Sequence, residues 1–246
     1  ILSILKEKYD MEEEDFLSAE FEVVPAGPAR DYGLDRSMIM AYGHDDRVCS
    51  YPSFMATLAQ DKVKYTSVCL LVDKEEIGSV GATGMQSRFF ENTTEEVMYA
   101  AGQYSELLLR RALKNSMMLS SDVSAAFDPN YPEVMEKKNS AYLGHGITFN
   151  KYTGSRGKGG SNDANPEYIA KLRKIMDDNQ VSFQTAELGK VDQGGGGTIA
   201  YILALYGMEV IDCGVAVLNM HAPWELTSKA DIYETKKGYE AFLKNV

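Results

Sequence analysis

The chain has 246 residues, a net charge of −11 and 44% apolar residues. This size and apolar content suffice for one domain with a sizeable core. The negative charge argues against a nucleic-acid or anionic-membrane partner, and no stretch approaches the ~20 apolar residues that span a bilayer. The three cysteines are scattered without Cys-x-x-Cys spacing, which is typical of reduced, buried side chains. We therefore expect a soluble, cytoplasmic protein.

Hydrophobic periodicity and turn residues predict strands that alternate with helices. The clearest helix spans 94–114, where Thr93 or Thr94 can cap the start and basic residues lie near the end. A second clear helix spans 166–180, with a proline in its first turn. The other expected elements are strands over 22–25, 37–43, 65–72, 116–121, 144–152, 181–185 and 210–218, helices over 46–60, 197–206 and about 229–244, and a polar glycine-rich loop over 153–164. This alternation predicts the α/β class, with an α/β/α sandwich around a mostly parallel sheet.

Four strand-like segments end in side chains that can bind a metal ion. Open α/β sheets bind ligands beyond the carboxyl ends of their strands, so four such endings are expected to converge on one crevice. Asp, Glu and His together suit zinc, manganese or cobalt better than calcium. The endings are Asp45 and Asp46 after 37–43, Glu75 and Glu76 after 65–72, Asp122 after 116–121, and His221 after 210–220.

The Glu75–Glu76 pair is the most informative of these endings. Neighbouring side chains on an extended segment point to opposite sides, so one carboxylate can hold a metal while the other accepts a proton. An isolated pair of this kind is most often a solvated acidic turn, and only the other three endings favour a site. Asp45 is the expected ligand beside Asp46, which is expected to cap a helix or support the ligands.

Two further features leave alternatives open. His44 adjoins the expected ligands, and a supporting role and a structural role are equally compatible with its position. The glycine-rich loop over 193–198 lacks the G-x-x-x-x-G-K-[ST] arrangement of a nucleotide-binding loop. Close approach to a peptide, or tight packing, is the expected reason for its glycines.

The four motifs resemble the aspartyl aminopeptidase and aminopeptidase I family of dinuclear metallo-aminopeptidases. The matching segments are GHDDR at 43–47, DKEEIGS at 73–79, SSDVSAAFDPN at 120–130 and NMHAPWE at 219–225, and the resemblance covers nearly the whole chain. It implies a zinc-peptidase-like fold and two divalent metal ions, with zinc first and manganese or cobalt as alternatives. By this resemblance Asp45 bridges both ions and Glu75 is the general base. The other implied ligands are Glu76, Asp122 and His221.

The resemblance also implies a domain division. Residues 1–20 would be the remainder of an inserted β dimerisation domain that is mostly absent, and 21–246 a catalytic domain without its N-terminal portion. The family takes one more ligand from a histidine in an upstream H-x-D segment, and nothing before His44 matches it. We therefore expect the C-terminal part of a longer protein, and little or no activity from a chain that truly starts at Ile1. Homo-oligomers, commonly dodecamers, are expected from the family.

The implied activity is removal of N-terminal amino acids from peptides, by a water that two metals activate and Glu75 deprotonates. His145 lies where the family lines the substrate end of its cleft. Lys151, and with it Arg156 and Lys158, is a candidate for binding an acidic side chain or a peptide carboxylate. The preferred N-terminal residue stays open, with a lean toward neutral residues. The alternatives are a related dinuclear amidohydrolase or deacylase, and a non-catalytic fragment or assembly subunit.

Overall fold

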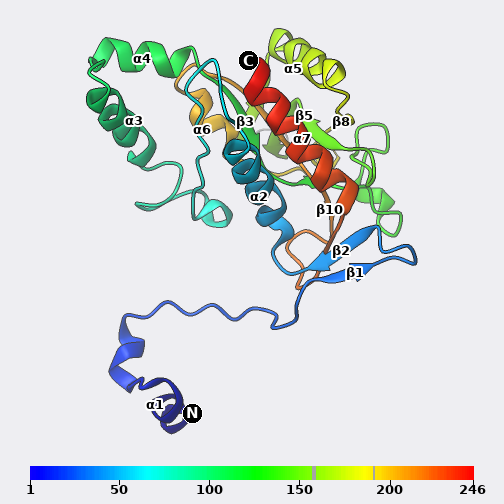
Figure 1. Ribbon diagram of the computed structural model, residues 1–246. Helices are drawn as coiled ribbons and strands as arrows, with labels where there is room; N and C mark the ends of the chain where they lie inside the picture. Colours follow the sequence, from blue (N-terminus) through cyan, green and yellow to red (C-terminus); the bar gives the residue numbers. More distant parts are fainter. Residues whose placement is uncertain (157–158, 191) are drawn as a thin grey trace.

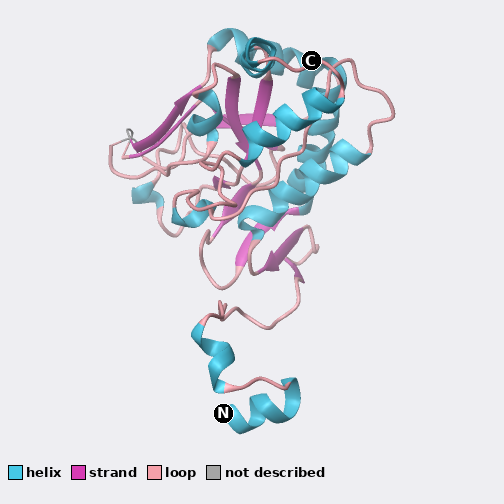
Figure 2. Ribbon diagram, turned by 90° about the vertical axis from the view of Figure 1, so that its left-hand side faces the viewer, coloured by secondary structure: helices cyan, strands magenta, loops and turns pink. Residues whose placement is uncertain are grey.

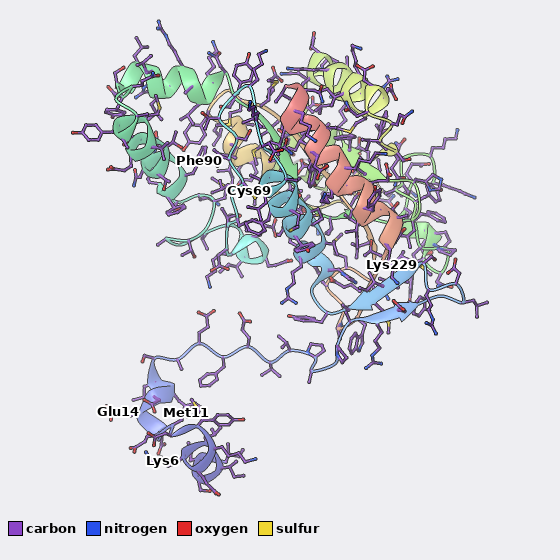
Figure 3. All side chains as sticks on the ribbon, in the orientation of Figure 1. Lys6, Met11, Glu14, Cys69, Phe90 and Lys229 are labelled. Carbon is purple, nitrogen blue, oxygen red and sulfur yellow. The ribbon has the colours of Figure 1, made fainter. Side chains whose placement is uncertain are left out.

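The computed structural model describes residues 1–156, 159–190 and 192–246. An N-terminal segment stands apart from the main body in both ribbon views (Figures 1 and 2). It contains helix α1 (Leu2–Tyr9) and the 3-10 helix η1 (Glu13–Leu17), neither of which buries a side chain. Figure 3 shows Lys6, Met11 and Glu14 on this segment, away from the other labelled side chains.

The described strands form two sheets and one hairpin. In the central sheet, of order β3-β9-β5-β8, β3 pairs with β9 and β5 with β8 in parallel, whereas β5 runs antiparallel to β9. The second sheet has the order β1-β2-β11-β10-β4, with β10 and β4 parallel and the other neighbours antiparallel. The strands are β1 (Arg30–Tyr32), β2 (Met38–Ala41), β3 (Met117–Ser121), β4 (Ser124–Ala125), β5 (Ile147–Asn150), β6 (Tyr152–Ser155), β7 (Gly159–Asp163), β8 (Phe183–Ala186), β9 (Glu209–Gly214), β10 (Ala216–Leu218) and β11 (Glu225–Ser228).

Helices cover both faces of the central sheet (Figure 1). Side chains alternate between the two faces of a strand. Leu119 and Ile211 therefore lie in a core with α2, α5 and α7, while Met118 and Val210 lie in a second core with α4 and α6. The helices are α2 (His44–Leu58), α3 (Phe89–Ala100), α4 (Glu106–Lys114), α5 (Pro166–Asp178), α6 (Ala200–Ala204) and α7 (Lys229–Asn245). The expected α/β/α arrangement is confirmed. None of the helices in the described ranges is long and apolar enough to cross a membrane.

Two predicted elements differ in the middle of the chain. The single helix over 94–114 is wrong, because Gly102 adopts a φ of 69° and the chain divides into α3 and α4. The cap of α4 is Ser105, whose hydroxyl accepts a hydrogen bond from the Leu108 amide at 3.2 Å. The polar loop over 153–164 is also wrong, since β6 and β7 form an antiparallel hairpin there. Both strands of this hairpin consist mostly of polar residues and glycine, so hydrophobic periodicity does not predict them.

The buried strand predicted over 65–72 is wrong as well. The segment forms no strand pairing among the described residues, and Val68 and Leu71 are 64% and 57% exposed. An apolar, β-branched segment becomes a strand only where another strand supplies backbone hydrogen-bond partners. Figure 3 shows Cys69 on this segment. Residues 70–73, 82–85, 87, 89 and 90 line a cavity of about 370 Å³. The short strand predicted over 22–25 is irregular and largely exposed for the same reason.

Candidate metal centre

Asp45 lies where strand β2 turns into helix α2. Gly43 makes this turn with a φ of 70°, in the left-handed region that favours glycine. Asp45 keeps a non-helical backbone, with a ψ of 106°, although it stands in the first turn of α2. The N-cap of α2 is Gly43, and no side-chain capping hydrogen bond is formed at this helix start. Both carboxylates are left for other partners.

Asp122 lies at the point where the chain passes from the central sheet to the second sheet. β3 ends at Ser121 in the central sheet and β4 begins at Ser124 in the second sheet. The neighbouring parallel segment of the same chain makes the same change at Val215, from β9 to β10. The Asp122 amide donates to the carbonyl of Cys213 at 3.1 Å. A Cβ on Gly214 would lie only 2.1 Å from the Asp122 carbonyl oxygen, so glycine is required for this close approach.

His221 follows β10, the continuation of β9 in the second sheet. The strand predicted over 210–218 is therefore two strands in different sheets, and His221 comes three residues after the end of the second one. Its φ of 66° places the backbone in the left-handed region, which is uncommon for a residue other than glycine. The imidazole is exposed at the mouth of the site.

Glu75 and Glu76 lie on a single 3-10 turn, η2 (Glu75–Ile77), and not on an extended segment. Lys74 and Gly78 flank this turn with φ values of 66° and 92°. The alternation of side chains along a strand therefore does not explain why the two carboxylates have different surroundings. The difference comes from the turn itself, which leaves Glu75 half-buried and Glu76 exposed.

Five of the predicted or neighbouring side chains come together in two groups that share Asp45. In each group, one potential ligand atom from every residue lies within 4.8 Å of the others. The Nε2 atom of His221 lies 3.0 Å from Asp45 Oδ2 and 3.3 Å from Glu76 Oε2. The first group consists of Asp45, Glu76 and His221, and the second of Asp45, Asp46 and Asp122.

The electrostatics of these groups fit a bound cation. Burial and the Glu76 carboxylate raise the pKa of Asp45 to about 7, and burial and the Asp45 carboxylate raise the pKa of Asp46 to about 8. Burial and the Asp46 charge raise the pKa of Asp122 well above its usual range. Within the described ranges no lysine or arginine forms an ion pair with these carboxylates, and Asp46 Oδ1 is buried without a hydrogen-bond partner. Divalent cations relieve such repulsion.

Glu75 lies outside both groups but close to them. Its charge contributes to the raised pKa values of Asp45, Asp46 and Asp122. Burial, and then the neighbouring Glu76 carboxylate, raise the pKa of Glu75 itself. A carboxylate that faces a cluster of ligands without belonging to it is suited to accept a proton.

His145, Lys151 and His44 are not brought into the cluster. His145 lies on the exposed turn before β5, where its Nδ1 is 3.1 Å from the carbonyl oxygen of Leu143. Lys151 pairs with Asp163 and donates to the carbonyl of Ala164 at 3.0 Å. His44 is buried, with its Nε2 3.2 Å from the carbonyl oxygen of Ile39, which gives it a structural role. Lys158 lies outside the described residues.

Sequence reasoning missed one buried residue of the site, Glu225. Its carboxylate accepts hydrogen bonds from the backbone amides of Asp45, at 2.9 Å, and of His221, at 2.8 Å. The available signal was its place at the end of the NMHAPWE motif, four residues after His221. A glutamate at the start of a mostly polar segment carries no further mark in the sequence that would predict burial.

Comparison with known proteins identifies the family. The chain is 73% identical over 245 residues to a probable M18 family aminopeptidase 1 from Clostridium acetobutylicum, a match that covers 100% of this chain and 53% of that protein. A solved M18 aminopeptidase from Thermotoga maritima superposes with a TM-score of 0.96 at 45% identity, covering 100% of this chain and 54% of that one. A more distant solved structure, the mApe1 dodecamer of Saccharomyces cerevisiae, has a TM-score of 0.70 at 25% identity and covers 89% of this chain and 48% of that one.

The chain thus spans about half the length of the relatives it matches. Residues 1–243 match the family described as aminopeptidase I zinc metalloprotease (M18). The match includes the segments that carry both groups of candidate ligands. The chain belongs to the M18 family of aminopeptidase I zinc metalloproteases.

Proposed function

We propose that the complete protein is a metal-dependent aminopeptidase that removes N-terminal amino acids from peptides. The observation that carries this proposal is the Asp45 carboxylate, which belongs to two adjacent groups of potential ligands. A carboxylate shared in this way is the expected partner of two neighbouring divalent ions. Membership of an aminopeptidase family supports the same reaction class.

Two divalent ions, zinc first and manganese or cobalt as alternatives, would be held by the two groups. Asp45, Glu76 and His221 would hold one ion. Asp45 and Asp122 would hold the other, with Asp46 beside them in the second group as a supporting residue. When bound, such ions polarise the scissile carbonyl and lower the pKa of a water molecule toward neutrality. Asp, Glu and His donors match the ligand preferences of zinc. The family description as zinc metalloproteases favours the same metal.

Glu75 is the proposed general base. It accepts a proton from the attacking water and passes the proton to the leaving amine. Its place outside both ligand groups, with its charge acting on residues of each, supports this role over that of a ligand. The free amine of the substrate would bind a metal ion or nearby carboxylates, which would confine cleavage to the N-terminus.

Two further residues are proposed to contact the substrate. His145 is exposed, and by the family resemblance it would lie at the substrate end of the cleft. Lys151 is already paired with Asp163, so a substrate carboxylate would have to compete with that ion pair. This favours neutral over acidic N-terminal residues, in agreement with the sequence.

Assembly, domains and compartment follow as further proposals. The dodecamer of the yeast relative supports a homo-oligomer, in which 1–20 would belong to a dimerisation domain and 21–246 to the catalytic domain. Cys49, Cys69 and Cys213 are all free, which suits the reducing cytoplasm. In the described part of the chain the second ligand group contains only carboxylates, and this observation keeps a non-catalytic subunit as the alternative.

Metal removal and restoration test the proposal. The complete protein is treated with a chelator, and activity is assayed on aminoacyl p-nitroanilides and on N-acyl amino acids before and after zinc, manganese or cobalt is added. We expect loss of activity on the aminoacyl substrates and its recovery with metal. Activity confined to N-acyl amino acids would instead support a deacylase. Activity that is absent with every metal would support a non-catalytic subunit.

A further inference from the structure

Glu225 is a buried carboxylate at the junction of two elements that carry ligands. It opens strand β11 and is in register with Ala41, the last residue of β2, which leads to Asp45. It also follows His221 by four residues, across the turn between β10 and β11. Only 2% of its surface is exposed. The residue therefore lies behind the site, between the backbones of two candidate ligands.

Each oxygen of Glu225 accepts one backbone hydrogen bond. Oε2 accepts from the Asp45 amide at 2.9 Å, and Oε1 accepts from the His221 amide at 2.8 Å. One side chain thus joins two candidate ligands of the same ion that are far apart in the sequence. The His221 backbone has a φ of 66°, and the hydrogen bond from its amide stabilises this uncommon conformation.

The chemistry of the position requires an acid. A carboxylate offers acceptors on both oxygens, whereas a glutamine offers one acceptor and an amide group that would face the second N–H as another donor. A buried charge is unfavourable unless its hydrogen bonds are satisfied. Within the described residues no lysine or arginine forms an ion pair with Glu225, so the two amides are the partners that offset its burial.

We propose that Glu225 is a positioning residue that sets the separation of Asp45 and His221, so that carboxylate and imidazole reach the same metal ion. The inference rests on the proposed function, because it assumes that these two residues bind a metal. The 3.0 Å between His221 Nε2 and Asp45 Oδ2 is the distance that Glu225 maintains through the two backbones. Groups that hydrogen-bond to metal ligands commonly orient them in this way.

Asp231 supplies a matched control within the same chain. It is fully buried, and its two oxygens accept hydrogen bonds from the amides of Gly144 and Gly146, both at 2.7 Å. The arrangement is that of Glu225, one carboxylate between two backbone amides, but the amides belong to no candidate ligand. Replacing either acid by its amide therefore makes the same chemical change. Only at Glu225 do the hydrogen-bonded amides belong to candidate metal ligands.

The experiment compares zinc affinity, by competition with a chromogenic chelator, and thermal stability in the complete protein and its Glu225→Gln and Asp231→Asn variants. We expect both variants to lose thermal stability. Zinc binding to the group of Asp45, Glu76 and His221 should weaken roughly 10–100-fold in Glu225→Gln, the usual effect of losing a group that orients a ligand. Asp231→Asn should bind zinc as the unaltered protein does.

Unaltered zinc affinity in folded Glu225→Gln would overturn the proposal, as would equal weakening in both variants. If Glu225→Gln does not fold, Glu225→Asp undergoes the same titration, because its shorter side chain keeps both acceptors but does not reach both amides. Wild-type affinity in that variant would also overturn the proposal. Failure of the unaltered protein to bind any divalent metal would instead count against the proposed function.

Discussion

The candidate site has a strand-built half and a turn-built half. Asp45, Asp122 and His221 follow strands that are paired in a sheet, whereas Glu75 and Glu76 follow a segment with no strand pairing in the described chain. The Asp45 side chain is 8% exposed and the Glu76 side chain 58%. The comparison indicates two different roles: the strand-built half fixes the proposed shared ligand, and the turn-built half presents the proposed base and an accessible carboxylate.

The two halves also differ in what holds them in place. The strand-built half is fixed by ladder hydrogen bonds and by the buried Glu225 carboxylate. The turn-built half is tied by an isolated bridge between Asp73 and Gly84 and by ion pairs of Lys74 with Asp73 and Glu20. Exposed ion pairs of this kind contribute little to stability, so we expect the turn-built half to depend more on the metal ions proposed to bind there.

Removing the shared carboxylate should have the largest effect. In the complete protein, Asp45→Asn should lose both metals and with them all turnover, because one carboxylate contributes to two ligand groups. His221→Ala should lose mainly one metal, since the imidazole belongs to a single group. Metal content per subunit, measured by elemental analysis, checks the pair. Equal losses in both variants would count against Asp45 as the bridge.

A substitution in the turn-built half should reduce turnover without loss of metal. Glu75→Gln keeps the shape of the side chain but does not accept a proton. We expect full metal content and a loss of turnover of roughly 10²–10⁴-fold, the usual contribution of a positioned general base. Steady-state kinetics measure the turnover of this variant, and elemental analysis measures its metal content. Loss of metal in this variant would show that Glu75 is a ligand and that the roles within the pair are reversed.

A pair of apolar substitutions, one buried and one exposed, tests the contrast in packing. Ile211 is fully buried in the central sheet, and Ile211→Ala should lower the free energy of unfolding by about 2–5 kcal/mol. Leu71 is exposed on the unpaired segment, so Leu71→Ala should change the free energy of unfolding by less than about 0.5 kcal/mol. Urea denaturation of the 246-residue chain measures both. Similar losses would contradict the description of 65–72 as an unpaired segment.

The pH dependence of stability tests the electrostatics of the strand-built half. The pKa values of Asp45 and Asp46 are raised from 3.8 to about 7 and about 8 without metal. Between pH 3.8 and about 8 the folded state therefore binds more protons than the unfolded state, and the free energy of unfolding falls as pH rises. Melting temperatures in chelator should decline over this window. Excess zinc should flatten the decline, and an equal decline with zinc would argue against metal binding at these carboxylates.

The sequence predicts the strand-built half well and the turn-built half poorly. Apolar runs before Asp45, Asp122 and His221 become strands because neighbouring strands pair with them, so local pattern and tertiary structure agree. The run over 65–72 has the same pattern, but its backbone has no strand partner among the described residues. Hydrophobic periodicity predicts which side chains are buried. It does not predict which strands supply hydrogen-bond partners for the backbone.

The details that sequence reasoning missed depend on contacts between distant residues. Glu225 gains its role only when β11 pairs with β2, and Asp46 joins the second group only when β3 delivers Asp122 beside it. The division of 94–114 into two helices is a different case, because Gly102 was visible in the sequence. A single glycine weakens a predicted helix by about 1 kcal/mol, and here it ends the helix.

The most direct test of the central claim is anomalous diffraction at the zinc edge from crystals of the complete protein grown with zinc. The account predicts two peaks, both with an Asp45 carboxylate oxygen at about 2.0–2.2 Å. One of these peaks should also have Glu76 and His221 as ligands, and the other Asp122. A single peak, or two peaks of which only one contacts Asp45, would contradict a site built around a shared carboxylate.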